Sequence, residues 1–211
     1  MTAERCTGVV LAGGNASRYG GRPKGLERVA GRRIIDRVVA ALAAATDDLM
    51  LIANDPAADE WLPGVTRHGD VRIGLGSLGG IHAALVHARG PVLVVAWDMP
   101  FVPGALLIEL RGAASNADVV VPESGSRRGL EPLCGFYAPP CRAAIERRLD
   151  ADDRRVIGFF DDVRVARLGY DDVARHGDPA MIFMNVNSPE DLGVAEAYAA
   201  TPDGSGNRQE A

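Results

Sequence analysis

The stretch Val9-Val10-Leu11-Ala12-Gly13-Gly14-Asn15-Ala16-Ser17-Arg18-Tyr19-Gly20-Gly21-Arg22-Pro23-Lys24 decides the fold expected for the whole chain. A short apolar run rich in β-branched residues ends in glycines, and Arg18, Arg22 and Lys24 follow before any apolar helical pattern begins. This order is typical of a strand that leads into an anion-binding loop. Glycines permit positive φ angles and bring backbone N–H groups close to a ligand, and the cationic side chains add charge that the amides lack. The stretch therefore predicts a loop that holds a polyphosphate.

The residues after this loop predict a parallel sheet. Apolar residues recur at helical spacing from Ile34 to Leu42, which indicates an amphipathic helix that ends near Ala45. Residues 49–53 then form a near-continuous apolar run, typical of a parallel strand buried on both faces. Such a βαβ unit is right-handed in nearly all cases, so the glycine loop lies at the carboxyl edge of the sheet, where such sheets bind ligands. The expected fold class is α/β, Rossmann-like, with a mostly parallel central sheet and helices on both faces.

The strongest strand of the chain carries a candidate metal ligand. Residues 91–96 are apolar throughout, as expected for a central strand, and Asp98 follows at its carboxyl end. That end lies on the same edge of the sheet as the glycine loop. A carboxylate placed there can hold a divalent cation against a triphosphate.

The rest of the chain continues the alternation of strands and helices. We expect strands at 64–68, 118–121, 130–137 and 181–184, and helices at 74–88, 103–113 and 141–149. Ser188, with Pro189 after it and Asp191 three residues on, predicts the N-cap of a final helix. We expect one domain over residues 1–200 and a disordered tail over 201–211.

Length, composition and charge narrow the class of protein. A chain of 211 residues, 47% apolar and 24% charged, can bury the core of one α/β domain. The net charge is −5 and the basic residues are scattered, which argues against a nucleic-acid partner. Three cysteines, Cys6, Cys134 and Cys141, lack metal-ligand spacing and indicate reduced thiols. With no signal peptide and no apolar run of membrane length, we expect a soluble, cytoplasmic protein with no membrane partner.

Two common phosphate-binding motifs are excluded at the first loop. A Walker A motif needs Gly-Lys followed by Ser or Thr, whereas Lys24 lies between Pro23 and Gly25. Gly-x-Gly-x-x-Gly is absent from the loop but occurs at Gly74 to Gly79, with Asp98 near the offset of a ribose-binding acid. A dinucleotide-dependent oxidoreductase is therefore an alternative. It is disfavoured because the strand before these glycines is weak and the fingerprint normally lies in the first βα turn.

The residues from Leu11 to Leu26 follow the pattern Leu-Ala-Gly-Gly-x-x-x-Arg-x-Gly-Gly-x-x-Lys-Gly-Leu. This pattern closely resembles the signature loop of molybdenum cofactor guanylyltransferases, nucleotidyltransferases with the Rossmann-like fold of the nucleotide-diphospho-sugar transferase type. Tyr19 departs from the methionine that is usual in this family, and Ser77 replaces the proline of its second glycine cluster. The resemblance covers nearly the whole chain and includes Asp-x-Pro-Phe from Asp98 and Asn-x-Asn-Ser-Pro-Glu from Asn185.

The resemblance implies an enzyme that transfers GMP from GTP to the phosphate of the molybdopterin cofactor and releases pyrophosphate. The attacking phosphomonoester has a second pKa of about 6 and is largely dianionic at neutral pH, so it needs no general base. The barrier lies in bringing two anions together, which calls for positioning, cationic side chains and magnesium. A sequence with no obvious histidine-based dyad agrees with this chemistry.

The resemblance also implies a role for individual residues. The nucleotide is held by Leu11, Ala12, Gly13, Gly14, Lys24, Asn54, Asp70 and Asp98, and the catalytic residues are Arg18, Lys24 and Asp98. Asp98 and Asn187 ligate Mg²⁺, and Arg154 and Arg155 lie near the phosphate of the acceptor. Two of these assignments have alternatives. The family pattern can place Ile52 where Asn54 is assigned, and the two arginines can form a solvated charge cluster with Asp152 and Asp153.

Two other functions stay open. The first is a related nucleotidyltransferase that uses CTP or another nucleotide, or a different phosphate acceptor. The second is a non-catalytic nucleotide-binding protein that delivers the cofactor to molybdoenzymes. Retention of both Lys24 and Asp98 argues against the second, because a non-catalytic relative has no need of a metal ligand. Direct docking of client molybdoenzymes or of cofactor-biosynthesis proteins is a further open question.

Overall fold

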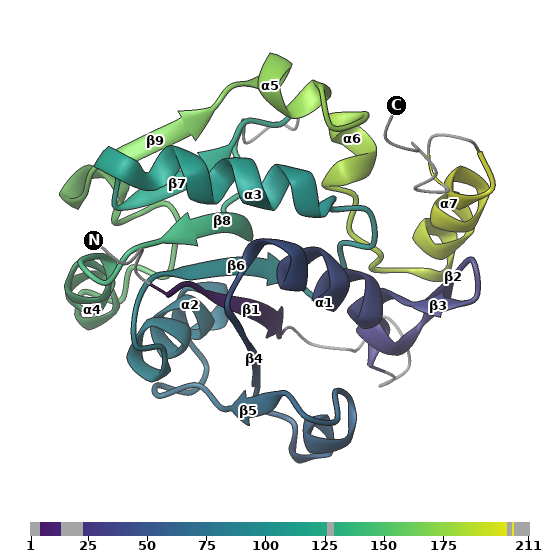
Figure 1. Ribbon diagram of the computed structural model, residues 1–211. Helices are drawn as coiled ribbons and strands as arrows, with labels where there is room; N and C mark the ends of the chain where they lie inside the picture. Colours follow the sequence, from purple (N-terminus) through teal and green to yellow (C-terminus); the bar gives the residue numbers. More distant parts are fainter. Residues whose placement is uncertain (1–4, 14–22, 126–128, 202–203, 205–211) are drawn as a thin grey trace.

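A seven-stranded sheet forms the centre of the computed structural model, which describes residues 5–13, 23–125, 129–201 and 204 (Figure 1). The strand order is β5-β4-β1-β6-β8-β7-β9. The bounds are β1 Thr7–Ala12, β4 Asp48–Ala53, β5 Thr66–His68, β6 Val92–Ala96, β7 Val119–Pro122, β8 Cys134–Tyr137 and β9 Val165–Leu168. β8 alone runs against its neighbours β6 and β7, and the other pairs are parallel. The α/β fold with a mostly parallel sheet is therefore confirmed.

The strand order places a binding edge beside β1. The chain leaves β1 for β4 and β5 on one side and returns to β6 on the other, so the direction of winding reverses at β1 and β6. A crevice outside the carboxyl ends of strands at such a switch point is where open α/β sheets bind ligands. The backbone N–H of Trp97 donates to the carbonyl of Leu11 at 3.2 Å and joins the two strand ends.

Helices cover both faces of the sheet, whose central strands β1, β4 and β6 are apolar on both sides. α1 Ile34–Ala45 and α3 Gly104–Gly112 pack together in one apolar cluster. α2 Gly76–His87 and α4 Cys141–Asp150 pack in the other. The short 3-10 helices are η2 Lys24–Leu26, η3 Pro56–Glu60, η4 Ala113–Asn116 and η5 Phe160–Asp162. All three cysteines lie buried, and burial raises the pKa of the Cys141 thiol to about 12.

A small third cluster brings the end of the described chain to the binding edge. α7 Pro189–Ala199 packs against the two-stranded ribbon of β2 Arg28–Val29 and β3 Arg32–Arg33, and the shared core includes Val29, Val186 and Ala195. Figure 1 shows this unit beyond the carboxyl ends of β1 and β6. The expected N-cap is confirmed, because the Ser188 hydroxyl accepts from the backbone N–H of Asp191 at 3.2 Å.

Two expectations from the sequence need correction, and several short elements were missed, among them the β2–β3 ribbon. Residues 181–184 do not form a strand, because helix α6 Pro179–Ile182 lies there. The Asp178 carboxylate accepts from the Ala180 N–H and Pro179 begins the helix, so local capping decides the conformation of a short apolar run. The strand expected at 130–137 is shorter and begins at Cys134. β9 was missed because it is half-exposed, and α5 Tyr170–Ala174 because it is only five residues long.

Part of the expected organisation lies outside the described residues. Residues 205–211 of the expected tail, and Gly14 and Arg18 of the glycine loop, belong to this group. Within the described ranges, no helix has the length and apolar character to cross a membrane.

The close approach of α1 and α3 predicts a stability change at Gly104. A Cβ atom there would lie 2.9 Å from the Cβ of Ala44 and 3.3 Å from the carbonyl oxygen of Ala41, and neither atom moves without shifting a helix. Gly104→Ala should lower the free energy of unfolding in urea by about 1–3 kcal/mol. Gly193→Ala is the matched control, because Gly193 lies within α7 and has nothing within 4 Å of an added Cβ. It should raise stability by about 0.5–1 kcal/mol. Equal effects of the two substitutions would contradict this packing.

Candidate active site

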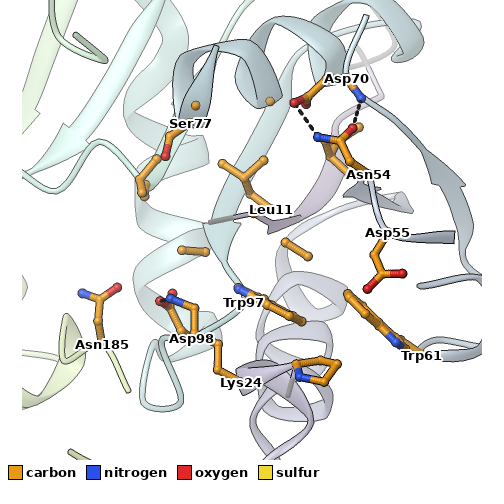
Figure 2. A pocket seen from close by; sticks show the side chains of 18 of the residues that line it. Leu11, Lys24, Asn54, Asp55, Trp61, Asp70, Ser77, Trp97, Asp98 and Asn185 are labelled. Atoms are coloured by element: carbon orange, nitrogen blue, oxygen red, sulfur yellow. Dashed lines mark hydrogen bonds and ion pairs between the residues drawn. The ribbon is translucent and has the colours of Figure 1, made fainter. Parts of the chain in front are cut away.

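A cavity of about 810 Å³ opens at the carboxyl edge of the sheet. It lies outside the ends of β1, β4 and β6, with the start of α2 as one wall (Figure 2). The lining residues are Leu11, Ala12, Gly13, Pro23, Lys24, Ile52, Asn54, Asp55, Trp61, Asp70, Ile73, Gly74, Gly76, Ser77, Gly80, Ala96, Trp97, Asp98, Leu133 and Asn185. All the nucleotide-contacting residues expected from the sequence that fall in the described ranges line this cavity.

A buried ion pair lies at one end of the cavity. The Nζ atom of Lys24 donates to Oδ2 of Asp98 at 2.5 Å and to Oδ1 of Asn187 at 2.7 Å. The side chains of Lys24 and Asp98 are 16% and 8% exposed. In this environment a charged group is stabilised only by a partner of opposite charge and by hydrogen bonds. The structure therefore brings together three residues that the sequence singled out separately.

The backbone around this cluster fixes the two oxygen ligands. Asp98 is the second residue after the end of β6, and its carbonyl oxygen accepts from the N–H of Val186 at 2.9 Å. The backbone N–H of Asn187 donates to Oδ2 of Asp191 at 2.9 Å, in the first turn of α7. The cap of α7 thus holds Asn187 next to Asp98.

The donor set of this cluster fits a magnesium ion. A carboxylate oxygen of Asp98 and an amide oxygen of Asn187 converge on one point, which the ammonium group of Lys24 marks as a cation position. Magnesium prefers oxygen ligands and is usually held by one or two carboxylates together with substrate phosphates. The described residues contain no group of three or more His, Cys, Asp or Glu side chains placed to hold a metal, so the remaining ligands would come from substrate and water.

A second polar pair lies on the other side of the cavity. The Nδ2 atom of Asn54 donates to Oδ2 of Asp70, and the backbone N–H of Asp70 donates to Oδ1 of Asn54, both at 2.7 Å. Figure 2 shows this pair away from Lys24 and Asp98. One amide hydrogen of Asn54 and one carboxylate oxygen of Asp70 remain available to a ligand. Ile52, the alternative to Asn54, also lines the cavity, with an apolar side chain on β4.

Two tryptophans that the sequence did not single out form an aromatic part of the cavity lining. The rings of Trp61 and Trp97 stack with centroids 5.0 Å apart and planes 17° apart. Trp97 also lies against Gly25, where an added Cβ would approach its ring to 2.4 Å. Only glycine at position 25 therefore lets the segment that carries Lys24 approach this ring. Asp55 and Asn185 are further cavity residues that were not predicted.

The two arginines assigned to the acceptor lie in ion pairs with neighbouring aspartates. Arg154 pairs with Asp152 at 2.8 Å, and its Nη1 atom donates to the carbonyl of Gly74 on the cavity rim at 3.3 Å. The Arg155 side chain and its backbone N–H hold the pKa of Asp153 well below its usual range. Arg154 thus reaches the rim of the cavity. Both arginines also form the ion pairs with Asp152 and Asp153 that the alternative, a solvated charge cluster, predicts.

The four histidines lie outside the cavity lining. His82 is buried and its Nε2 atom lies 3.0 Å from Oε1 of Glu146, while His68 and His87 stack 4.1 Å apart. Burial, with His68 nearby, lowers the pKa of His87. His176 pairs with Glu109.

Comparisons with known proteins agree with this geometry. Residues 8–165 match the family model described as a MobA-like NTP transferase domain. A protein of Desulfosudis oleivorans named molybdenum cofactor guanylyltransferase is 35% identical over 194 residues, which cover 90% of this chain and 94% of that protein. A protein of the same name from Rhodopseudomonas palustris is 38% identical over 205 residues, with 90% and 92% covered. The crystal structure of molybdopterin-guanine dinucleotide biosynthesis protein A from Archaeoglobus fulgidus superposes with a TM-score of 0.75 at 28% identity, over 90% of this chain and 97% of that one.

The Asn54–Asp70 pair predicts a local change in hydrogen exchange. The backbone N–H of Asp70 lies outside any helix or strand and donates to the Asn54 side chain. Asn54→Ala should therefore speed exchange of the Asp70 amide by about tenfold or more, because the opened hydrogen bond no longer protects it. The amide of Val10 in the buried centre of β1 is the internal control and should keep its rate. An unchanged Asp70 rate would show that this pair does not form in solution.

Proposed function

The chain belongs to the MobA-like NTP transferase family, and we propose that it transfers GMP from GTP to the phosphate of the molybdopterin cofactor. Relatives named molybdenum cofactor guanylyltransferase, or probable molybdenum cofactor guanylyltransferase, match this chain over most of both lengths. The chain is therefore an enzyme of the nucleotidyltransferase type. The products are pyrophosphate and the guanine dinucleotide form of the cofactor. The substrates GTP and molybdopterin are the partners that we propose, with Mg²⁺ as the metal and the cytoplasm as the location.

The observation that carries this proposal is the Lys24–Asp98–Asn187 cluster at one end of the cavity. A cationic side chain next to two oxygen ligands suits a triphosphate that arrives with a divalent cation. Leu11 and Ala12 end β1, and with Gly13 they line the same cavity. We assign the phosphates of GTP to this end, together with Gly14 and Arg18 of the glycine loop.

The nucleoside then lies toward the Asn54–Asp70 pair. A carboxylate that accepts and an amide that donates can both be satisfied by the hydroxyl groups of a ribose or the polar edge of a base. Because Asp70 is bonded to Asn54 and not to the Asp98 cluster, we assign it to the nucleotide and not to the metal. The stacked pair of Trp61 and Trp97 supplies an apolar surface in the same cavity.

The residues of the cavity position two anions for an in-line attack. The acceptor phosphate is largely dianionic at neutral pH and attacks the α-phosphoryl group directly, so no side chain has to remove a proton. Lys24 neutralises charge on the phosphates, and Asp98 and Asn187 would hold the magnesium ion. When bound, that ion stabilises charge on the α-phosphoryl group and on the leaving pyrophosphate. Arg18 is proposed to contribute a second cation.

The acceptor is proposed to approach past the rim at Gly74. Arg154 and Arg155 are our candidates for its phosphate, and Arg154 already reaches the carbonyl of Gly74. Each arginine would have to exchange an aspartate for the phosphate. Arg154 and Asp152 are both largely exposed, so solvent and salt screen their ion pair and a dianion can compete with it.

Variants at the cluster test the reaction. With GTP labelled in the α-phosphate and molybdopterin as acceptor, Lys24→Ala and Asp98→Asn should each lower turnover by about a hundredfold or more, because charge stabilisation in the transition state is lost. Asp48→Asn is the control, since it makes the same change at an exposed carboxylate that pairs with Arg5 on the protein surface. Transfer to molybdopterin by Asp98→Asn at the wild-type rate would remove Asp98 from the mechanism.

The same assay separates the alternative functions. Offered the four nucleoside triphosphates, the wild-type protein should use GTP. Preference for CTP would mean that the protein is a nucleotidyltransferase of the same chemistry that uses cytosine in place of guanine. Tight GTP binding without transfer to any acceptor would instead favour the non-catalytic delivery protein.

A further inference from the structure

Lys24 is the only lysine among the 23 Lys and Arg residues of the chain. Its Nζ atom lies 2.5 Å from Oδ2 of Asp98 and 2.7 Å from Oδ1 of Asn187, the two oxygen atoms assigned to the metal. Both carboxylate and ammonium are nearly closed to solvent. The ammonium group therefore fills the point at which the metal ligands converge.

The chemistry of the two basic side chains explains why a lysine stands here. An ammonium group is a compact point charge that donates in several directions, whereas a guanidinium group is a flat fork suited to bidentate pairing. Two oxygen ligands arranged around a small spherical ion can accept an ammonium in place of that ion. A guanidinium group is too large and too flat for the same position.

We propose that Lys24 holds the metal position in the nucleotide-free protein and gives it up only when a nucleoside triphosphate arrives. This inference rests on the proposed function. The phosphates offer the ammonium group a new anionic partner, so Lys24 moves to them and leaves Asp98 and Asn187 to the divalent cation. Lys24 thus determines the order of binding in addition to its role in charge neutralisation.

The proposal follows from the charges at this end of the cavity. A metal ion that enters alone must displace Lys24 and leave a mostly buried ammonium without its carboxylate, which is costly. A triphosphate removes that cost. Binding of metal and of nucleotide is therefore coupled, and by linkage each raises the affinity for the other by the same factor.

Metal binding in the absence of nucleotide tests this exchange of the Lys24 ammonium group for a divalent cation. Calorimetric titration with Mn²⁺ should give weak binding to the wild-type protein and at least about tenfold tighter binding to Lys24→Met, within the usual range of coupling between two sites. Arg167→Met is the matched control, because it removes the same charge at an exposed side chain on β9. It should leave Mn²⁺ affinity within about twofold of wild type. Equal Mn²⁺ affinity for wild type and a folded Lys24→Met would overturn the proposal.

A single-lysine chain allows a second measurement on the unaltered protein. With lysine labelled with ¹³C at Cε, the NMR spectrum should contain one lysine signal, that of Lys24. GTP without metal should shift this signal, and millimolar Mg²⁺ without GTP should not. A shift with Mg²⁺ alone, equal to that with GTP, would contradict the exchange even if Lys24→Met fails to fold.

The two measurements also separate this inference from the proposed function. If the ¹³C signal of Lys24 does not shift with GTP and no GMP is transferred, the proposed function is wrong. If GTP is bound and GMP is transferred while Lys24→Met gains no affinity for Mn²⁺, the proposed function is supported. The proposal that Lys24 holds the metal position is then wrong.

Discussion

The carboxylate of Asp98 is the constraint on which the active site depends. It is buried at the carboxyl end of a central strand, and a charge in that position is stable only with a cation beside it. Lys24, 74 residues earlier, supplies that cation, and Asn187, 163 residues after Lys24, supplies a second acceptor for it. Three distant segments therefore meet around the ammonium group of Lys24.

The fold places the cavity at the carboxyl edge of the sheet and holds the polar side chains around it. The reversal of winding at β1 and β6 leaves a crevice beside their carboxyl ends, and the stacked tryptophans and the start of α2 form its walls. α7 packs on the β2–β3 ribbon, and its cap holds Asn187 beside Asp98. The first turn of α7, far from Asp98 in sequence, thus acts on the site through the backbone N–H of Asn187.

The sequence predicts the strands that form the centre of the sheet because β1, β4 and β6 are apolar on both faces. It predicts the place of Asp98 for the same reason, since a polar residue directly after a buried strand lies at the sheet edge. Residues 181–184 were assigned wrongly because a short apolar run does not distinguish a strand from a buried helical turn. Asp178 and Pro179 carry the capping signal that decides it. The contact between Lys24 and Asp98 and the stacking of Trp61 on Trp97 depend on tertiary structure, and no spacing along the chain reveals them.

We propose that Asp98 and Asn187 form one metal site and that Lys24 turns to the phosphates when substrate is bound. The decisive experiment is a crystal grown with GTP and Mn²⁺ and measured for anomalous scattering at the manganese edge. We expect one anomalous peak within bonding distance of an Asp98 carboxylate oxygen, with Nζ of Lys24 on a phosphate oxygen. A manganese peak elsewhere in the cavity, with Lys24 still bonded to Asp98, would contradict it.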